Sequence, residues 1–168
     1  MLNKTLQDAI NEQIAYELYS SNAYLGVASY MDSLGLKVLA AHFMTQSDEE
    51  RMHAKKFMHY LMEVGATVQV GAIDACASHF DSVEAAVKAS LDQEMRVTER
   101  INGLMGLAHE QKDYATASFL KWFVDEQVEE QATMNDLLMM VRHAGPHLLL
   151  VEDRLLKQGV TLPTAGGE

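Results

Sequence analysis

The chain has 168 residues, 48% of them hydrophobic, which is enough for one domain with its own core. The 24 acidic residues exceed the 13 Lys and Arg residues, and the net charge of −11 argues against nucleic acid and anionic membranes as partners and favours cations. Cys76 is the only cysteine, so a disulfide framework within the chain is excluded and neither an oxidising compartment nor a thiolate metal cluster is implied. We find neither an apolar leader nor a run of about 18 apolar residues, and we expect a soluble cytoplasmic protein.

Glycine and proline divide the chain into predicted helices. We expect a single domain with four long helices, a short helix opened by Pro146 and a flexible tail, at residues 5–34, 37–64, 82–111, 114–144, 147–158 and 159–168. Asp81 with Glu84 offers the third helix a capping box, and Asp113 can cap the fourth.

The connections predict the topology of the bundle. A tight turn at Gly35 and another near Asp113 make two antiparallel helix hairpins. The segment 66–81 is too long for a hairpin turn but can span the bundle when extended, so the second and third helices should run parallel. Two hairpins joined by one long crossover form a ferritin-like, all-α four-helix bundle. The short helix 147–158 is too short to be stable alone and carries many leucines, and we favour a role for it in oligomerisation.

Each long helix has an apolar stripe at heptad-like spacing, and each stripe is interrupted by polar residues near its middle. The interruptions are centred on Glu17, Glu50 with His53, Glu94, and Gln127 with Glu130. Positions at mid-helix meet at mid-bundle whichever way the helices run. Several carboxylates cannot stay ionised together in a core without a counter-charge, because burial and repulsion cost several kcal/mol. Two divalent cations would supply that charge, and oxygen ligands with one imidazole suit iron or manganese.

These residues resemble the non-haem bacterial ferritins along nearly the whole chain. In that family a Glu, a Glu-x-x-His, a Glu and a Gln-x-x-Glu on successive helices form a di-iron ferroxidase centre. The resemblance implies that Glu17, Glu50 and His53 hold the first iron. It implies that Glu50, Glu94 and Glu130 hold the second, with Glu50 bridging and Gln127 as a weak ligand beside it. A third iron is implied at the positions of Glu49, Glu126 and Glu129 with Glu130, although these flanking acids could equally form a solvated face.

The haem-containing bacterioferritins differ from this chain at two positions. They have a second Glu-x-x-His on the fourth helix, where this chain has Glu130 in place of the histidine. Their haem-ligating Met directly follows the Glu of the second helix, where this chain has Arg51, and Met52 points about 100° away around the helix. We therefore predict no haem.

Other residues allow two interpretations. Tyr24 shares the face of Glu17, and core packing is as well supported as a redox or ligand-orienting role. Trp122 and the methionines are interpreted as core packing. The other histidines are interpreted as surface or interface residues, namely His42, His59, His79, His109, His143 and His147.

By resemblance, the predicted function is iron storage in a hollow 24-subunit homo-oligomer that oxidises Fe(II) with O2 or H2O2. One alternative is a di-iron or di-manganese oxidase or peroxidase of the same superfamily that stores no metal. The other is a non-enzymatic helical interaction module with ion-paired buried acids, which would need basic residues in the core stripes. The four stripes contain no Lys or Arg.

Overall fold

The computed structural model describes residues 2–162, and the remaining part of the predicted tail lies outside the described residues. Within that range the chain forms four long α-helices and one short one, and no helix is long and apolar enough to cross a membrane. Their bounds are α1 Lys4–Ser33, α2 Lys37–Glu63, α3 Val83–Glu110, α4 Tyr114–Ala144 and α5 Leu149–Lys157. The predicted all-α bundle with a short C-terminal helix is confirmed.

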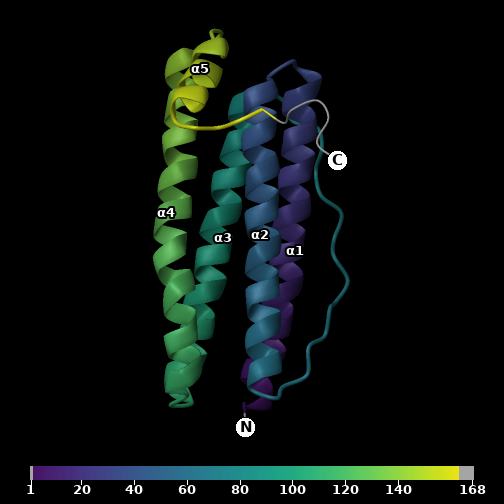
Figure 1. Cartoon of the computed structure of the whole chain (residues 1–168), viewed down its shortest axis with the longest axis vertical. Coiled ribbons are helices and arrows are strands. Elements are labelled where there is room, and N and C mark those ends of the chain that lie inside the picture. Colours follow the sequence, from purple (N-terminus) through teal and green to yellow (C-terminus); the bar gives the residue numbers. More distant parts are fainter. Residues whose placement is uncertain (1, 163–168) are drawn as a thin grey trace.

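The four long helices form two hairpins, α1 with α2 and α3 with α4 (Figure 1). The segment between α2 and α3 runs back along the outside of α1, so α2 and α3 are parallel. It is fastened to α1 by Asn11, whose side chain donates to the Thr67 carbonyl at 3.0 Å and accepts from the Gln69 N–H at 2.7 Å. This is the crossover topology predicted from the connection lengths.

The core consists of two apolar clusters with a polar layer between them. One cluster contains Tyr24, Phe43 and Met134, and the other contains Phe57, Leu120 and Phe123. The predicted stripes run from Leu6 to Met31, from Leu36 to Val64, from Val83 to Ala108 and from Leu120 to Val141. Their residues are buried except Val64, which is partly buried. The polar interruptions are buried as well, at the level where the heptad-like spacing places them.

Local details at the helix ends differ from the prediction. The N-cap of α3 is Ser82, whose hydroxyl accepts from the Ala85 N–H at 3.0 Å, whereas Asp81 was expected to be the cap. A serine one residue later can also cap a helix, which is why the sequence did not distinguish the two. Helix α5 begins at Leu149, so Pro146 lies in the preceding turn and not in the first helical turn. Asp113 caps α4 as predicted, accepting from the Thr116 N–H at 3.0 Å.

The interpretation of the methionines as core packing was wrong for several of them. Met31 and Met134 are fully buried, whereas five others are more exposed than a core role allows: Met44, Met52, Met62, Met95 and Met139. Composition alone therefore does not fix the burial of a methionine. His42 is partly buried, and burial lowers the pKa of its imidazole.

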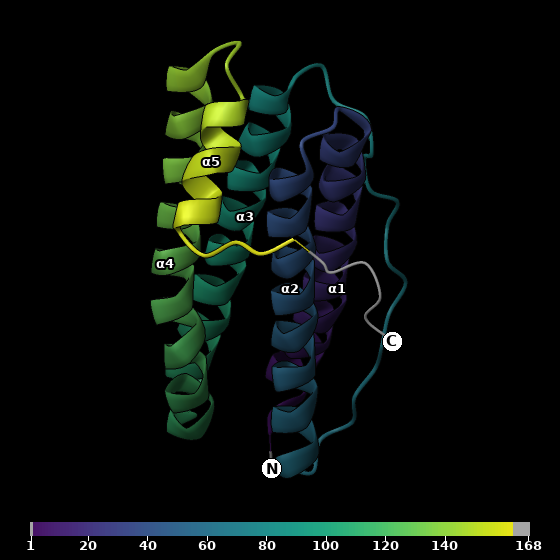
Figure 2. The ribbon, with the colours of Figure 1, turned by 45° about the horizontal axis from the view of Figure 1, so that its top comes forward.

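Helix α5 packs against its own bundle through one face (Figure 2). Val151 and Leu155 are buried, while Leu149 and Leu150 remain exposed. Between the buried residues, the Glu152 carboxylate accepts hydrogen bonds from the backbone N–H groups of Val38 and Leu39, at 2.7 and 2.9 Å. These are among the first N–H groups of α2, whose N-cap residue makes no side-chain bond of its own. A residue more than 100 positions away thus caps α2 and anchors α5.

We expect Glu152→Ala to lower the free energy of unfolding by about 2–3 kcal/mol, because hydrogen bonds to a charged group contribute that much and two N–H groups lose their partner. Urea denaturation of the variant measures the loss. Asp153→Ala is the matched control, since its exposed ion pair with Lys157 is worth at most about 1 kcal/mol. Equal stability of the two variants would show that Glu152 is not the anchor of α5.

Gly26 on α1 lies directly under the crossover segment. A Cβ added there would be 2.2 Å from the Ala77 carbonyl oxygen, which is backbone and cannot rotate away. We expect Gly26→Ala to destabilise the protein by about 1–3 kcal/mol, the typical cost of overpacking. Gly103→Ala on α3 is the control, because no atom lies within 4 Å of its added Cβ and the helix should gain stability. Thermal unfolding of both variants tests whether the first substitution lowers the stability and the second raises it.

Candidate metal centre

The polar layer at mid-bundle brings together residues from all four long helices. Glu17 and Glu94 have no exposed surface, and Glu50, His53 and Gln127 are at most 2% exposed. Glu130 is 8% exposed and lies at the edge of the layer. Each residue interrupts an apolar stripe of its helix, so the packing of the stripes forces these side chains inward.

Glu17, Glu50 and His53 form the most compact group. One ligand atom of each lies within 4.8 Å of the others, a separation that a single metal ion can bridge. The His53 Nδ1 atom is 3.3 Å from Glu50 Oε2. The Glu50 carboxyl lies close enough to Glu17 and Glu94 for the charges of both to add to burial in raising its pKa. A position next to both carboxyls is the one that a ligand shared by two cations would occupy.

The electrostatics show carboxyls that hold protons when no cation is present. Burial, with the Glu17 charge as the next cause, raises the pKa of Glu50 well above its usual value. Burial raises the pKa of Glu17 to about 7 against the hydrogen bonds of Glu50 and Gln13, and burial with the Glu94 charge raises that of Glu130 to about 8. Burial and the Lys56 charge lower the pKa of His53 to about 4, so its imidazole is neutral and able to bind a metal.

Three atoms of this layer are buried without a hydrogen-bond donor or acceptor. They are Glu17 Oε2, His53 Nε2 and Glu94 Oε2. Buried polar atoms are almost always paired, and leaving one unpaired costs about 1–3 kcal/mol. Such atoms next to several carboxyls fit a cation, which would coordinate the oxygens and displace their protons.

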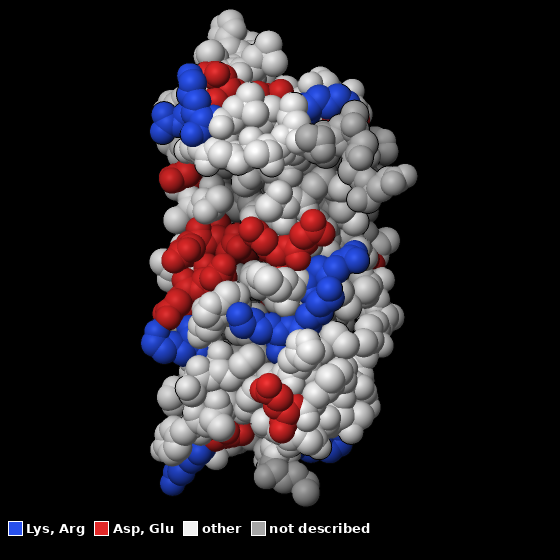
Figure 3. All heavy atoms as spheres, viewed as in Figure 1, with Lys and Arg blue, Asp and Glu red and all other residues white. Residues whose placement is uncertain are grey.

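A second group extends from the buried layer toward the surface. His53, Glu126 and Glu130 also place ligand atoms within 4.8 Å of one another. Glu126 and Glu49 are partly exposed and Glu129 is exposed, and their charges contribute to the raised pKa of Glu130. Acidic side chains gather midway along the face that α2 and α4 present in Figure 3. The predicted flanking acids therefore lie beside the centre at its outer edge.

One side of the polar layer is formed by Glu94 on α3, Gln127 on α4 and Tyr24 on α1. The Tyr24 hydroxyl donates to Glu94 Oε1, and burial followed by the Glu94 charge raises the pKa of Tyr24 well above its usual value. The Gln127 oxygen accepts from the Thr98 hydroxyl at 3.0 Å. Burial raises the pKa of Glu94, and Gln127 lies near enough to that carboxyl to act against this shift. Tyr24 is bound directly to a carboxyl of the layer, so it does more than fill space.

Four residues around the layer were not singled out from the sequence. Gln13 and Arg100 approach Glu17, Thr98 holds Gln127, and Lys56 lies over the Trp122 ring at 3.4 Å from its centroid. Trp122 in turn packs edge to face against His53. Gln13 lies four residues before Glu17 and Lys56 three after His53, so the helical period places them on the same face as a ligand candidate, a signal that could have found them.

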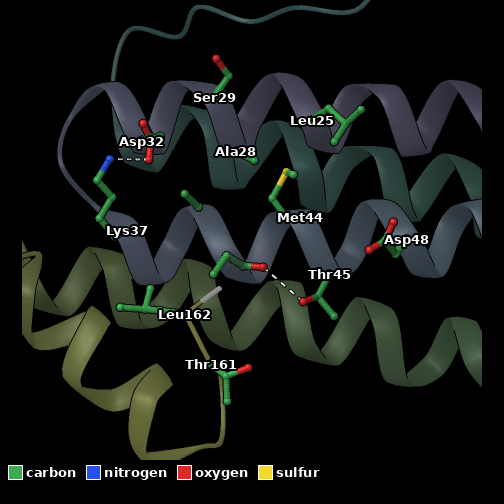
Figure 4. Close-up of a pocket in the computed structure, with 12 residues that line it drawn as sticks. Leu25, Ala28, Ser29, Asp32, Lys37, Met44, Thr45, Asp48, Thr161 and Leu162 are labelled. Atoms are coloured by element: carbon green, nitrogen blue, oxygen red, sulfur yellow. Dashed lines mark hydrogen bonds and ion pairs between the residues drawn. The ribbon is translucent and has the colours of Figure 1, made fainter. Parts of the chain in front are cut away.

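A surface groove away from the polar layer is not the candidate site (Figure 4). It measures about 710 Å³ and lies against α1 and α2, where Leu25, Met44 and Leu162 line it. Its charged lining includes Asp32 and Lys37, which pair with each other at 2.6 Å. None of the buried carboxylates of the polar layer opens into it.

A two-hairpin bundle with carboxylates and an imidazole buried at its centre defines the ferritin-like class of metal proteins. Comparison with known proteins gives the family: residues 7–143 match the ferritin-like domain, and the chain belongs to the ferritin family. It is 43% identical over 158 residues to the bacterial non-heme ferritin of Staphylococcus saprophyticus, covering 92% of this chain and 95% of the relative. It is 42% identical over 132 residues to the one from Staphylococcus aureus, covering 79% of this chain and 80% of the relative.

Solved structures of ferritins superpose on this chain and agree with the family assignment. An open pore ferritin from Archaeoglobus fulgidus superposes with a TM-score of 0.90 at 38% identity, covering 92% of this chain and 98% of that chain. A form of that ferritin engineered to be closed superposes with a TM-score of 0.91 at 37% identity, covering 96% of this chain and all of that chain.

Proposed function

We propose that this protein is an iron-storage ferritin that oxidises Fe(II) at a di-iron centre within each subunit. The observation that carries the proposal is the buried group of Glu17, Glu50 and His53, whose unpaired atoms fit a cation. Its position at the centre of a ferritin-family bundle supports iron as the cation. Iron is the substrate: two Fe(II) give up one electron each, and with two protons these reduce O2 to H2O2, or H2O2 to two waters.

Within this proposal the carboxyls have different roles. Glu17, Glu50 and His53 hold the first iron, and Glu50, Glu94 and Glu130 the second, with Glu50 shared. The position of the Glu50 carboxyl next to Glu17 and Glu94 supports the shared role. Hard, anionic oxygen ligands favour Fe(III) over Fe(II), and the protons that they release on binding iron are available for reduction of the oxidant.

The partly exposed acids provide a third position and a path toward the surface. Glu49, Glu126 and Glu129 with Glu130 are the proposed ligands, and the closeness of His53, Glu126 and Glu130 supports a continuous route from the buried centre. Gln127 is a weak ligand or a donor to Glu94, and its engagement by Thr98 supports the second role. Tyr24 orients Glu94 and is placed to exchange an electron with the centre.

We propose further that the subunits assemble into a cytoplasmic shell of 24 copies that stores Fe(III) mineral. The exposed Leu149, Leu150 and Leu156 on α5 support a subunit contact there, because several exposed apolar side chains on one short helix are typical of an interaction site. The alternative interaction module requires ion-paired buried acids. The described ion pairs that involve Lys or Arg join side chains at least 39% exposed, so this alternative lacks support.

Two measurements test the proposal. Apo protein mixed with Fe(II) in air should form Fe(III) faster than buffer alone and keep hundreds of irons in solution. Sedimentation should show a particle many times the mass of one subunit. Rapid oxidation by a monomer or dimer that retains only a few irons would instead favour a substrate oxidase of the same superfamily.

A further inference from the structure

A buried glutamine and an arginine at the surface form a hydrogen-bonded chain to Glu17. The Arg100 Nε atom on α3 donates to Gln13 Oε1 at 2.8 Å, and Gln13 Nε2 donates to Glu17 Oε1 at 2.8 Å. Gln13 is 1% exposed, and Arg100 is partly exposed with its guanidinium over the Tyr16 ring, 4.5 Å from the centroid. The chain therefore joins a solvent-accessible cation to a buried ligand candidate through a single amide.

The direction of this chain is fixed by chemistry. A guanidinium can only donate, so the oxygen of the Gln13 amide must face Arg100. The NH2 group must then face Glu17, where it donates to one carboxyl oxygen. With Oε1 engaged in this way, Glu17 has one oxygen left, Oε2, which is buried and has no N–H or hydroxyl donor. A Gln alone could turn its amide around, and Arg100 prevents that.

We propose that Arg100 and Gln13 act as positioning residues that hold Glu17 as a single-oxygen ligand and thereby set the cation affinity of the position formed by Glu17, Glu50 and His53. Partners of this kind, which hold a ligand without touching the metal, typically change metal affinity by about 10–100-fold. The inference rests on the proposed metal centre. It assigns a function to two residues outside the proposed ligand set.

Gln13→Glu is the most discriminating variant. The new carboxylate keeps the shape of the side chain and still accepts from Arg100, but when ionised it cannot donate to Glu17 and repels it. Arg100→Met removes the donor that fixes the amide while keeping much of the apolar stem. Arg96→Met is the matched control, because Arg96 also lies on α3 and contacts Tyr16, through its hydroxyl at 3.2 Å, but does not contact Gln13.

The measurement is anaerobic titration of the intact apo protein with Zn(II) by calorimetry, with the Co(II) absorption spectrum as a second readout of ligand number. Wild type and Arg96→Met should bind the first ion equally. Gln13→Glu should bind it about 10–100-fold more weakly with a changed Co(II) spectrum, and Arg100→Met should show a smaller loss in the same direction. A purely structural role would lower the thermal midpoint without changing the spectrum of the Co(II) that binds.

The outcomes are distinguishable. If wild type binds neither Zn(II) nor Co(II), the proposed metal centre itself is wrong. If wild type binds both ions and the Gln13 and Arg100 variants match Arg96→Met in affinity and spectrum, the centre stands and the positioning role is overturned. If Gln13→Glu fails to fold, the Arg100→Met variant tests the positioning role alone. It should fold, because the Arg100 side chain is already partly exposed.

Discussion

Glu50→Gln should abolish rapid Fe(II) oxidation, reducing its initial rate by more than about 100-fold. Residues that merely support a ligand typically account for 10–100-fold in affinity or activity, so removing a charge shared by two cations should cost more. The Glu50 carboxyl lies next to Glu17 and Glu94, so the substitution affects both proposed iron positions. Stopped-flow absorbance after mixing apo protein with Fe(II) in air measures the rate.

The matched control for this substitution is Glu63→Gln on the same helix. Glu63 is exposed at the last residue of α2, so its neutral variant should oxidise iron at the wild-type rate. The amide at position 50 is close in size to the carboxyl, so the fold should be retained, and circular dichroism checks this. Wild-type oxidation by Glu50→Gln would place the reaction elsewhere and refute the proposed centre.

The second large effect is a pH-dependent stability that cation binding reverses. In the apo protein, burial raises the pKa of Glu17 to about 7 and that of Glu130 to about 8, above the usual value of 4.5. A folded state that binds protons more tightly than the unfolded state loses stability as the pH rises. The stabilising contribution of these two carboxyls is therefore complete below about pH 4.5 and is lost as the pH rises through about 7 to 8.

The contribution of His53 to stability changes with pH in the opposite direction and over a different pH range. Its pKa is lowered from 6.5 to about 4, so its contribution to stability grows as the pH rises from about 4 to 6.5 and is constant above that. Between pH 6.5 and 8 the contribution of His53 is constant, so the change in stability expected from these three groups comes from the two carboxyls. The thermal midpoint of the apo protein should fall across this interval, and the fall should be smaller in Glu130→Gln.

A divalent cation should restore the lost stability. At 100 times its dissociation constant, one bound ion adds about 2.7 kcal/mol, which in a chain of this size raises the thermal midpoint by roughly 5–10 °C. The rise should be larger at pH 8 than at pH 6, because fewer carboxyl protons must then be displaced. Differential scanning calorimetry with Zn(II) and with a chelator gives both midpoints. A cation effect independent of pH would mean that the buried carboxyls are not the ligands.

The helical period explains why so much of the centre was predictable from sequence. Polar residues such as Glu17 and Glu94 fall in phase with the apolar residues around them, so a helix that buries its stripe also buries them. Their shared depth in four helices of similar length then predicts that they meet. The interpretation failed for the exposed methionines because helical period assigns burial only where a residue lies clearly within a stripe.

What sequence could not provide is the particular hydrogen bonds between residues distant along the chain. Nothing in the local sequence of Glu152 indicates that it caps α2, because that bond depends on how α5 folds back. Similarly, Arg100 and Gln13 are 87 positions apart, and only the packing of α3 on α1 makes them neighbours. Sequence gives the phase of each helix, but the angles and offsets between helices come from the packing of all the side chains at once.

The amino-acid sequence alone determined the bundle, its crossover and the set of buried acids, because hydrophobic period, glycine punctuation and connection length are local properties. The tertiary structure decided the rest. It placed the Glu50 carboxyl next to two others, engaged the Gln127 oxygen with Thr98 and linked Glu17 to the surface through Gln13. Each of these is a distance of a few ångströms between helices, and a distance of that kind exists only once the helices have packed.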